Sequence, residues 1–369
     1  MKFTGVKVFG EDFKFSVSDV CVADGLFADS SDGEEIDCSG LMMIPGLVDV
    51  HTHGAIGFAA SDNGFDAIEA LSRFQAEHGT TTFLPTLATS GVDELKENAI
   101  NIAKAKPAVS GAKIGGIHME GPFFSMKYKG AQTPEYIKNP DADAFFAINN
   151  ACGQLVKLIS IAPENEGSEE FVKKVKSSVK VAAGHTDSDY ETMVKAIEWG
   201  VTQLTHSFNA MRGLHHRNPG AIGAAIDSDI FCELISDGMH VHPAMVRLFY
   251  KAVGKERLVL ISDSVRPAYL PDGEYDSCGL KVIVKDGKAT LEDGTIAGSS
   301  STLFDCLKKT VEFGIPLEDA VRAATYNPAK AVGIENECGV IKTGRAADFV
   351  LVDEKLDIKA IYVNGKKIV

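Results

Sequence analysis

The chain has 369 residues, of which 45% are apolar, and its 37 basic and 51 acidic residues give a net charge of −14. A surface of this sign argues against a nucleic-acid partner and against attraction to anionic lipid. No apolar run is long enough to span a bilayer, and the opening MKFTGVKVFGEDF lacks the basic start, apolar stretch and cleavage site of a secretory signal. We therefore expect a cytoplasmic location, with no nucleic-acid or membrane partner.

The cysteines form no recognisable disulfide or zinc-finger pattern. They are odd in number and scattered, and none forms a CxxC pair. We expect them to be reduced packing residues. They are Cys21, Cys38, Cys152, Cys232, Cys278, Cys306 and Cys338.

Both ends of the chain show the sequence pattern that is typical of antiparallel strands. The first forty or so residues alternate apolar and polar positions between turns rich in Gly and Asp, and the last thirty repeat this pattern. Asn364-Gly365 is a strong hairpin signal in the second segment. Residues 1–46 and 337–369 are therefore predicted to form one small β-sandwich domain from both termini.

The region between them, 47–336, alternates strand-like runs with amphipathic helical stretches. This alternation is typical of parallel strands with crossover helices and predicts a (β/α)₈ barrel of the TIM type. The eight strand-like runs are MMIPGLVDVHTH, TTTFLPT, KIGGIHMEG, LVKLISIAP, VKVAAGH, VTQLTH, IFCELISDG and RLVLISD. The helical stretches are FDAIEALSRFQAEHG, VDELKENAINIAKA, DYETMVKAIEWG, HPAMVRLFYKAVG and STLFDCLKKTVEFG. An inserted hairpin is expected at 277–298, with turns at Asp286-Gly287 and Asp293-Gly294.

Five of the strand-like runs end in residues that can bind a metal. In His51-Thr52-His53 the two imidazoles fall on the same side of an extended chain, because side chains alternate with period two. The carboxyl ends of barrel strands meet at one face, where metal and catalytic sites are assembled. This pattern predicts a metal-dependent hydrolase. The strand-end residues are His51, His53, Glu120, His185, His206 and Asp263.

Longer motifs around these residues narrow the prediction to a family. The arrangement resembles the amidohydrolase superfamily and, within it, the N-acetylglucosamine-6-phosphate deacetylase family, from about residue 40 to 355. The HxxEGP and THxxNAM motifs are more specific than HxH, which many members of the superfamily share. The motifs are PGLVDVHTHG, GIHMEGPF, AAGHTDSD, THSFNAMRGLHHRNPG, SDGMHVHP, SDSVRPA and AGSSSTL.

The resemblance implies a site for one or two divalent ions per subunit. Glu120, His185 and His206 would hold the principal ion, and His51 and His53 a second one, with Glu120 able to bridge the two. Zinc or iron(II) is favoured, while manganese and cobalt also accept histidine and carboxylate ligands.

The resemblance also implies hydrolysis of the acetamide of N-acetyl-D-glucosamine 6-phosphate to D-glucosamine 6-phosphate and acetate, a step of amino-sugar catabolism. Metal-activated hydroxide would attack the carbonyl, and Asp263 would move the proton from the water to the leaving nitrogen. One motif departs from the family, because Gln132 stands where many members carry a loop histidine. The Gln132 amide could donate a hydrogen bond to the substrate carbonyl but cannot carry a proton.

The phosphate of such a substrate calls for Arg, His and backbone N–H groups. The positions that match the family are Asn209, the backbone amide of Ala210, and Arg217, while His240 would contact substrate from the opposite side. In this family an arginine of this loop crosses a dimer interface. We therefore expect a homodimer in which Arg217 contributes to the site of its partner.

Other readings stay open at this stage. The chain could act on N-acetylgalactosamine 6-phosphate instead. The two epimers differ in the orientation of one hydroxyl, and a single sequence does not show which residue recognises that hydroxyl. A dihydroorotase-like enzyme would not be expected to carry THxxNAM, and a noncatalytic barrel would usually lose ligands. Among the remaining histidines, His118 could support the metal site or simply pack in the core. No role is expected for His215, His216, His242 or His78, the last two of which lie at helix ends.

Overall fold

The centre of the molecule is a barrel of parallel strands, as predicted. The structure, a computed structural model, describes residues 1–277 and 279–369; the prediction for Cys278 lies outside the described residues. Each barrel strand pairs in parallel with the next one along the chain, from β6 through to β16. The strands are β6 (Leu47–Thr52), β9 (Thr80–Leu87), β11 (Ile117–Glu120), β12 (Val156–Ile161), β13 (Lys180–Ala183), β14 (Val201–Leu204), β15 (Phe231–Ile235) and β16 (Leu258–Ile261).

The barrel closes between its first and last strands through a few backbone hydrogen bonds. The N–H of Asp263 donates to the carbonyl of His51 over 2.9 Å, and the N–H of His53 donates to the carbonyl of Ser264 over 2.8 Å. These contacts lie at the carboxyl ends of β6 and β16. Barrel closure therefore places His51, in the first strand, beside Asp263, which follows the last strand.

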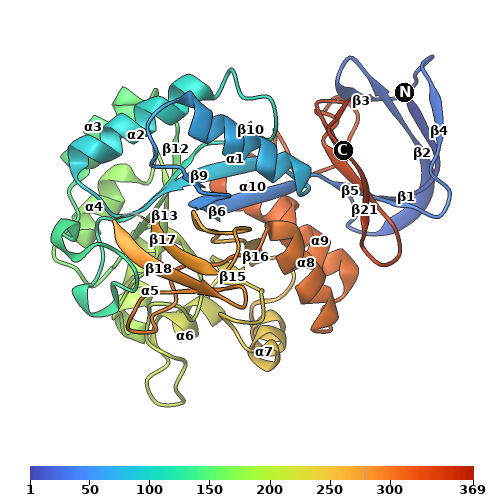
Figure 1. Ribbon diagram of the computed structural model, residues 1–369. Coiled ribbons are helices and arrows are strands. Elements are labelled where there is room, and N and C mark those ends of the chain that lie inside the picture. The colour runs from blue at the N-terminus through green and yellow to red at the C-terminus, as the bar shows by residue number, and fades with distance from the viewer. Residues whose placement is uncertain (278) are drawn as a thin grey trace.

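Helices cover the outside of the barrel (Figure 1). Most barrel strands are buried on both faces, which explains why they read as continuous apolar runs rather than alternating ones. The five helices expected from the sequence are α1 (Phe65–Glu77), α2 (Val92–Ala105), α5 (Tyr190–Trp199), α7 (Pro243–Val253) and α8 (Leu303–Glu312).

Five further helices were not expected from the sequence. They are 7–10 residues long, and the shortest of them offer only about two turns over which a helical period can be recognised. They are α3 (Ala142–Ala151), α4 (Ser168–Val175), α6 (Gly220–Ile226), α9 (Leu317–Ala324) and α10 (Tyr326–Val332). No helix among the described residues combines the length and the apolarity that a bilayer crossing requires.

Both termini build one β module beside the barrel (Figure 1). Its strands form a single sheet that curls until Leu26 bridges to Ala346. Phe349 stacks on Tyr362 with ring centroids 4.6 Å apart inside it, and Asn364 and Gly365 form the expected tight turn at φ 48° and 69°. The strands are β1 (Lys2–Phe9), β2 (Phe15–Ala23), β3 (Leu26–Ala28), β4 (Glu35–Asp37), β5 (Met42–Pro45), β20 (Phe349–Val352), β21 (Ile358–Val363) and β22 (Lys366–Lys367).

The structure thus confirms the predicted fold class, while the limits 1–46 and 337–369 stay predictions. An antiparallel sheet separate from the barrel follows β16, as expected from the inserted hairpin. The sheet starts earlier than expected, because its first strand precedes the predicted insert. Its strands are β17 (Gly273–Ser277), β18 (Leu280–Lys285) and β19 (Lys288–Thr290).

Candidate active site

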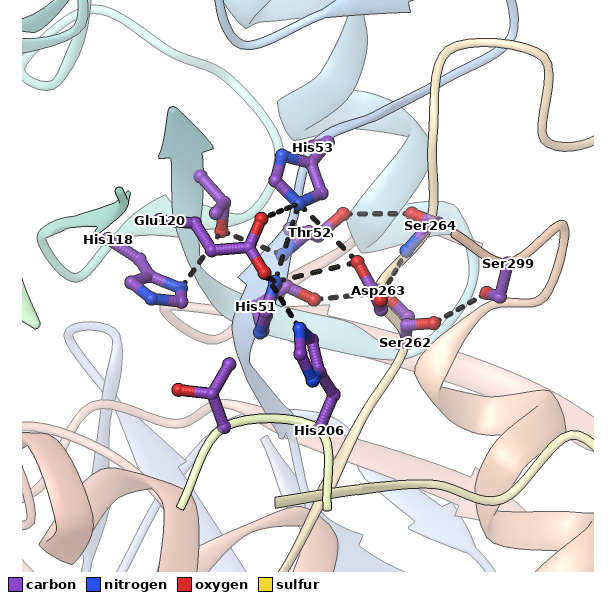
Figure 2. A network of polar contacts seen from close by, with 12 residues as sticks. His51, Thr52, His53, His118, Glu120, His206, Ser262, Asp263, Ser264 and Ser299 are labelled. Carbon is purple, nitrogen blue, oxygen red and sulfur yellow. Dashed lines mark hydrogen bonds and ion pairs between the residues drawn. The ribbon is translucent and has the colours of Figure 1, made fainter. Parts of the chain in front are cut away.

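The predicted metal ligands come together at the carboxyl ends of the barrel strands. His51 lies in β6 and Glu120 ends β11, while His185, His206 and Asp263 each lie two residues after the end of a strand. The side chains of His51, His53, Glu120, His206 and Asp263 point toward a common centre (Figure 2). Neighbouring parallel strands thus deliver residues that are far apart in the sequence to one place.

The backbone at this centre is strained. His185, His206 and Asp263 adopt positive φ angles of 45°, 27° and 47°. Non-glycine residues rarely occupy this region, and such strain gathers at functional sites. The left-handed conformation of these three residues turns the chain sharply just after each strand, where their side chains enter the site.

Two groups of possible metal ligands share Glu120. In the first, Nε2 of His206 lies 3.0 Å from Oε1 of Glu120 and 3.1 Å from Nε2 of His185. In the second, Nε2 of His51 lies 3.3 Å from the same oxygen, and Nε2 of His53 lies 3.2 Å from Oε2. Within each group the ligand atoms lie within 4.8 Å of one another. Glu120 therefore lies between two potential metal positions.

These distances fit a metal. Tetrahedral ligands at about 2.0–2.1 Å from a zinc ion lie about 3.3 Å from one another, which is close to the 3.1 and 3.3 Å between the paired imidazole nitrogens. Ring nitrogens that face each other this closely need a shared cation or shared protons between them. The donor set of imidazoles and a carboxylate suits a divalent transition metal.

The charges of the centre are strongly coupled. Burial opposes a charge on His53, but hydrogen bonding to Asp263 and Glu120 raises the pKa of its imidazole to about 9. Burial works against ionisation of Glu120 as well, yet the neighbouring His51, His185 and His206 hold the pKa of its carboxyl well below its ordinary value. The carboxylate is thus kept anionic beside its histidines, as a ligand must be.

Asp263 lies against the second ligand group. Its Oδ1 is 3.5 Å from Nε2 of His51 and 3.4 Å from Nε2 of His53. Its backbone is fixed on both sides, because its N–H donates to His51 and its carbonyl accepts the N–H of Ser299 over 2.7 Å. Burial disfavours its anion, but the neighbouring His51 and His53 lower the pKa of Asp263 overall. A fixed carboxylate at this place can accept a proton from a group held in the centre.

A pocket of about 570 Å³ opens above this centre. The β17–β19 sheet supplies part of an apolar wall through Leu280 and Val282. A pocket of this volume is of the size that holds small-molecule ligands. Its lining includes these residues predicted from the sequence: His53, Glu120, Gln132, His185, His206, Asn209, Ala210, His240 and Asp263.

Two predicted residues do not line the pocket. His51 lies beneath it and is fully buried. Arg217 is exposed on the loop before α6, where its Nη1 lies 2.8 Å from Nε2 of His216. Within one subunit, the structure therefore does not bring Arg217 together with the other candidates for substrate binding.

Two carboxylates beside the site were not predicted from the sequence. Glu233 is fully buried in the apolar strand β15 and lies 3.1 Å from Nδ1 of His51. Asp237 lies 2.7 Å from Nδ1 of His240 and accepts the backbone N–H groups of Met239 and His240. An acidic residue inside the apolar run IFCELISDG was the available signal for Glu233.

The other histidines occupy supporting or peripheral places. His118 is buried edge-on against His51, 4.5 Å between centroids, and its Nε2 lies 2.8 Å from Oγ of Ser160. Burial and the neighbouring His51 hold the pKa of His118 well below its ordinary value. His118 therefore supports the site from below rather than joining a ligand group. His242 begins α7, His78 ends α1, and His215 and His216 are exposed.

Residues 42–368 match the Amidohydrolase family, and the chain belongs to this family. Members of the family depend on a metal, and the two ligand groups are able to bind one.

Particular relatives share most of the chain. An N-acetylglucosamine-6-phosphate deacetylase of Bacillus subtilis is 36% identical over 324 residues, 86% of this chain and 82% of the relative. An N-acetylgalactosamine-6-phosphate deacetylase of Escherichia coli O157:H7 is 32% identical over 332 residues, 88% of this chain and 87% of the relative. A mutant N-acetyl-D-glucosamine-6-phosphate deacetylase of Mycobacterium smegmatis, solved in complex with N-acetyl-D-glucosamine-6-phosphate, superposes with a TM-score of 0.94 at 30% identity. That superposition covers 100% of this chain and 99% of the other.

Proposed function

We propose that the chain hydrolyses the acetamide of N-acetyl-D-glucosamine 6-phosphate to D-glucosamine 6-phosphate and acetate, in the breakdown of amino sugars. The observation that carries this proposal is the position of Asp263 beside two ligand groups that share Glu120, at the base of a pocket of about 570 Å³. The Bacillus and Mycobacterium relatives support the choice of substrate.

The ligand groups would hold one or two divalent ions, with zinc or iron(II) favoured over manganese or cobalt. Glu120, His185 and His206 would bind the principal ion, and His51 and His53 a second one. When bound, such an ion supplies Lewis acidity, which lowers the pKa of water and polarises a carbonyl.

Asp263 would act as general base and then as general acid. Its carboxylate would take the proton of the attacking water and deliver it to the amide nitrogen, which leaves only when it is protonated. Gln132 and His240 both line the pocket and would orient the substrate.

The phosphate would be bound by Asn209 and the backbone amide of Ala210, which line the pocket. A dianion also needs a cationic partner, and Arg217 lies outside the pocket of its own subunit. Since Arg217 is on an exposed loop, we propose a homodimer in which it reaches the phosphate site of the partner. The cytoplasmic location expected from the sequence stays a prediction.

A second candidate substrate is the galactosamine epimer, which the Escherichia relative favours. The two sugars differ in the orientation of one hydroxyl, and a site discriminates them by the hydrogen bonds that one of them leaves unmade.

The test is acetate release from each sugar phosphate by purified protein, before and after metal removal, with the metal counted in the same sample. Faster release from the glucosamine compound supports the proposal, and faster release from the galactosamine compound supports the alternative. Release from neither, by protein that contains metal, would rule out both substrates.

A further inference from the structure

Glu233 is a carboxylate in the interior of the barrel. It lies in the middle of β15 within the run FCELI, and its exposed fraction is 0%. A charged group in such a place is costly to bury unless hydrogen bonds compensate for the lost water. The hydrogen-bond partners of Glu233 therefore indicate why a carboxylate is placed at this buried position.

One oxygen of Glu233 contacts two strand ends. Oε2 accepts the backbone N–H of His206 over 3.2 Å and lies 3.1 Å from Nδ1 of His51. His51 belongs to one candidate ligand group and His206 to the other. A single buried oxygen thus joins the two groups from below, on the side away from Glu120.

The contact to His51 also determines where the ring carries its proton. Nε2 of His51 faces Oε1 of Glu120 and Nε2 of His53, both at 3.3 Å, so this nitrogen is the one available to a metal. An imidazole that binds a metal through Nε2 must carry its proton on Nδ1. That N–H then donates to Glu233, in the arrangement by which carboxylates orient metal-binding histidines.

We propose that Glu233 is a positioning residue for the metal centre, which fixes the ring of His51 and thereby the ligand group that contains it. It contacts His206 only through a backbone N–H, so its loss should weaken the His51 group more than the group of His206. This rests on the proposed function only in that the two groups bind metal; it does not depend on the identity of the substrate.

The proposal is tested by zinc binding to Glu233→Gln and Glu233→Met, measured as the number of ions per subunit and the dissociation constant in metal buffers. Gln keeps one acceptor oxygen, whereas Met keeps the length and removes both. We expect zinc at the site containing His51 to bind about 10-fold to 100-fold more weakly in Glu233→Met, with Glu233→Gln between it and the parent protein.

Asp237→Asn is the matched control. Asp237 is also a buried carboxylate on Nδ1 of a histidine, but His240 belongs to neither ligand group. Its substitution should leave the zinc count and affinity unchanged. The melting temperature of each metal-free variant is measured in parallel, because a purely structural Glu233 would lower it and weaken both ligand groups alike.

Several results would overturn the proposal: unchanged zinc affinity in Glu233→Met, equal weakening of both sites together with a lower melting temperature, or a His51→Ala variant that binds zinc like the parent. If the variants do not fold, nitrogen NMR of the zinc-loaded parent protein decides, and a proton on Nε2 of His51 would contradict it. Because no substrate is used, protein that binds zinc as expected but releases no acetate would refute the proposed function alone.

Discussion

Gln132 donates a hydrogen bond from Nε2 to Oε2 of Glu120 over 2.6 Å. Its orientation is fixed, because its Oε1 accepts the backbone N–H of Thr89 over 2.9 Å and only an oxygen can do so. Gln132 lines the pocket and also holds the carboxylate shared by both ligand groups.

Gln132→Ala should therefore weaken metal binding as well as substrate turnover. A hydrogen bond to a charged group contributes about 1.5–3 kcal/mol, so the metal dissociation constant should rise roughly 10-fold to 100-fold. Metal content after dialysis against a chelator series measures the effect. A variant that keeps full metal affinity and loses only turnover would show that Gln132 acts on the substrate and does not support metal binding.

Asp263→Asn should keep its metal and lose nearly all turnover. Asn has almost the shape of Asp but cannot accept the proton of water and return it, so we expect kcat to fall at least about 100-fold, the range of general acid–base catalysis. Steady-state acetate release and metal content are measured on one preparation. A variant with near-normal kcat would remove Asp263 from its proposed role.

Much of this site could be predicted from the sequence, for a clear physical reason. Strand-end residues such as His51 and Glu120 follow continuous apolar runs, and parallel strands bring their carboxyl ends to one face. Glu233 was not predicted, because its partner His51 lies 182 residues away and only the closed barrel brings them together. The short helix α6 was missed because its seven residues are all Gly, Ala or Ile and show no polar face.

Asp237→Asn should act on substrate binding through His240. Asp237 accepts from Nδ1 of that ring, whereas the amide group of Asn would turn a donor toward it and favour the other tautomer. We expect kcat/KM to fall at least about tenfold, mainly through a higher KM, while the metal content stays the same. A fall in kcat with an unchanged KM would contradict this assignment.

Two buried cysteines should resist thiol reagents. Burial raises the pKa of the thiols of Cys232 and Cys338 to about 12. Since only the thiolate reacts, about one ten-thousandth of each group is reactive at pH 8, and labelling should speed up about tenfold per pH unit toward pH 12. Mass spectrometry of labelled peptides from folded protein measures the rates, with the half-buried Cys21 as the internal comparison. Equal labelling of Cys21 and Cys232 at pH 8 would show that the barrel opens rapidly.

The exposed position of Arg217 allows a test of the shared active site by mixing subunits. Arg217→Ala and Asp263→Asn should each have little activity on the phosphorylated substrate, by losing phosphate binding and proton transfer respectively. In a mixed dimer, the subunit that keeps Asp263 would receive Arg217 from its partner, so one complete site forms. Random pairing makes at most about half of the dimers mixed, and each mixed dimer has one complete site of two, so acetate release should recover to at most about a quarter of the parent rate after the two variants are unfolded and refolded together. If Arg217 served the site of its own subunit, no mixed dimer would contain a complete site and activity would stay at the level of the single variants.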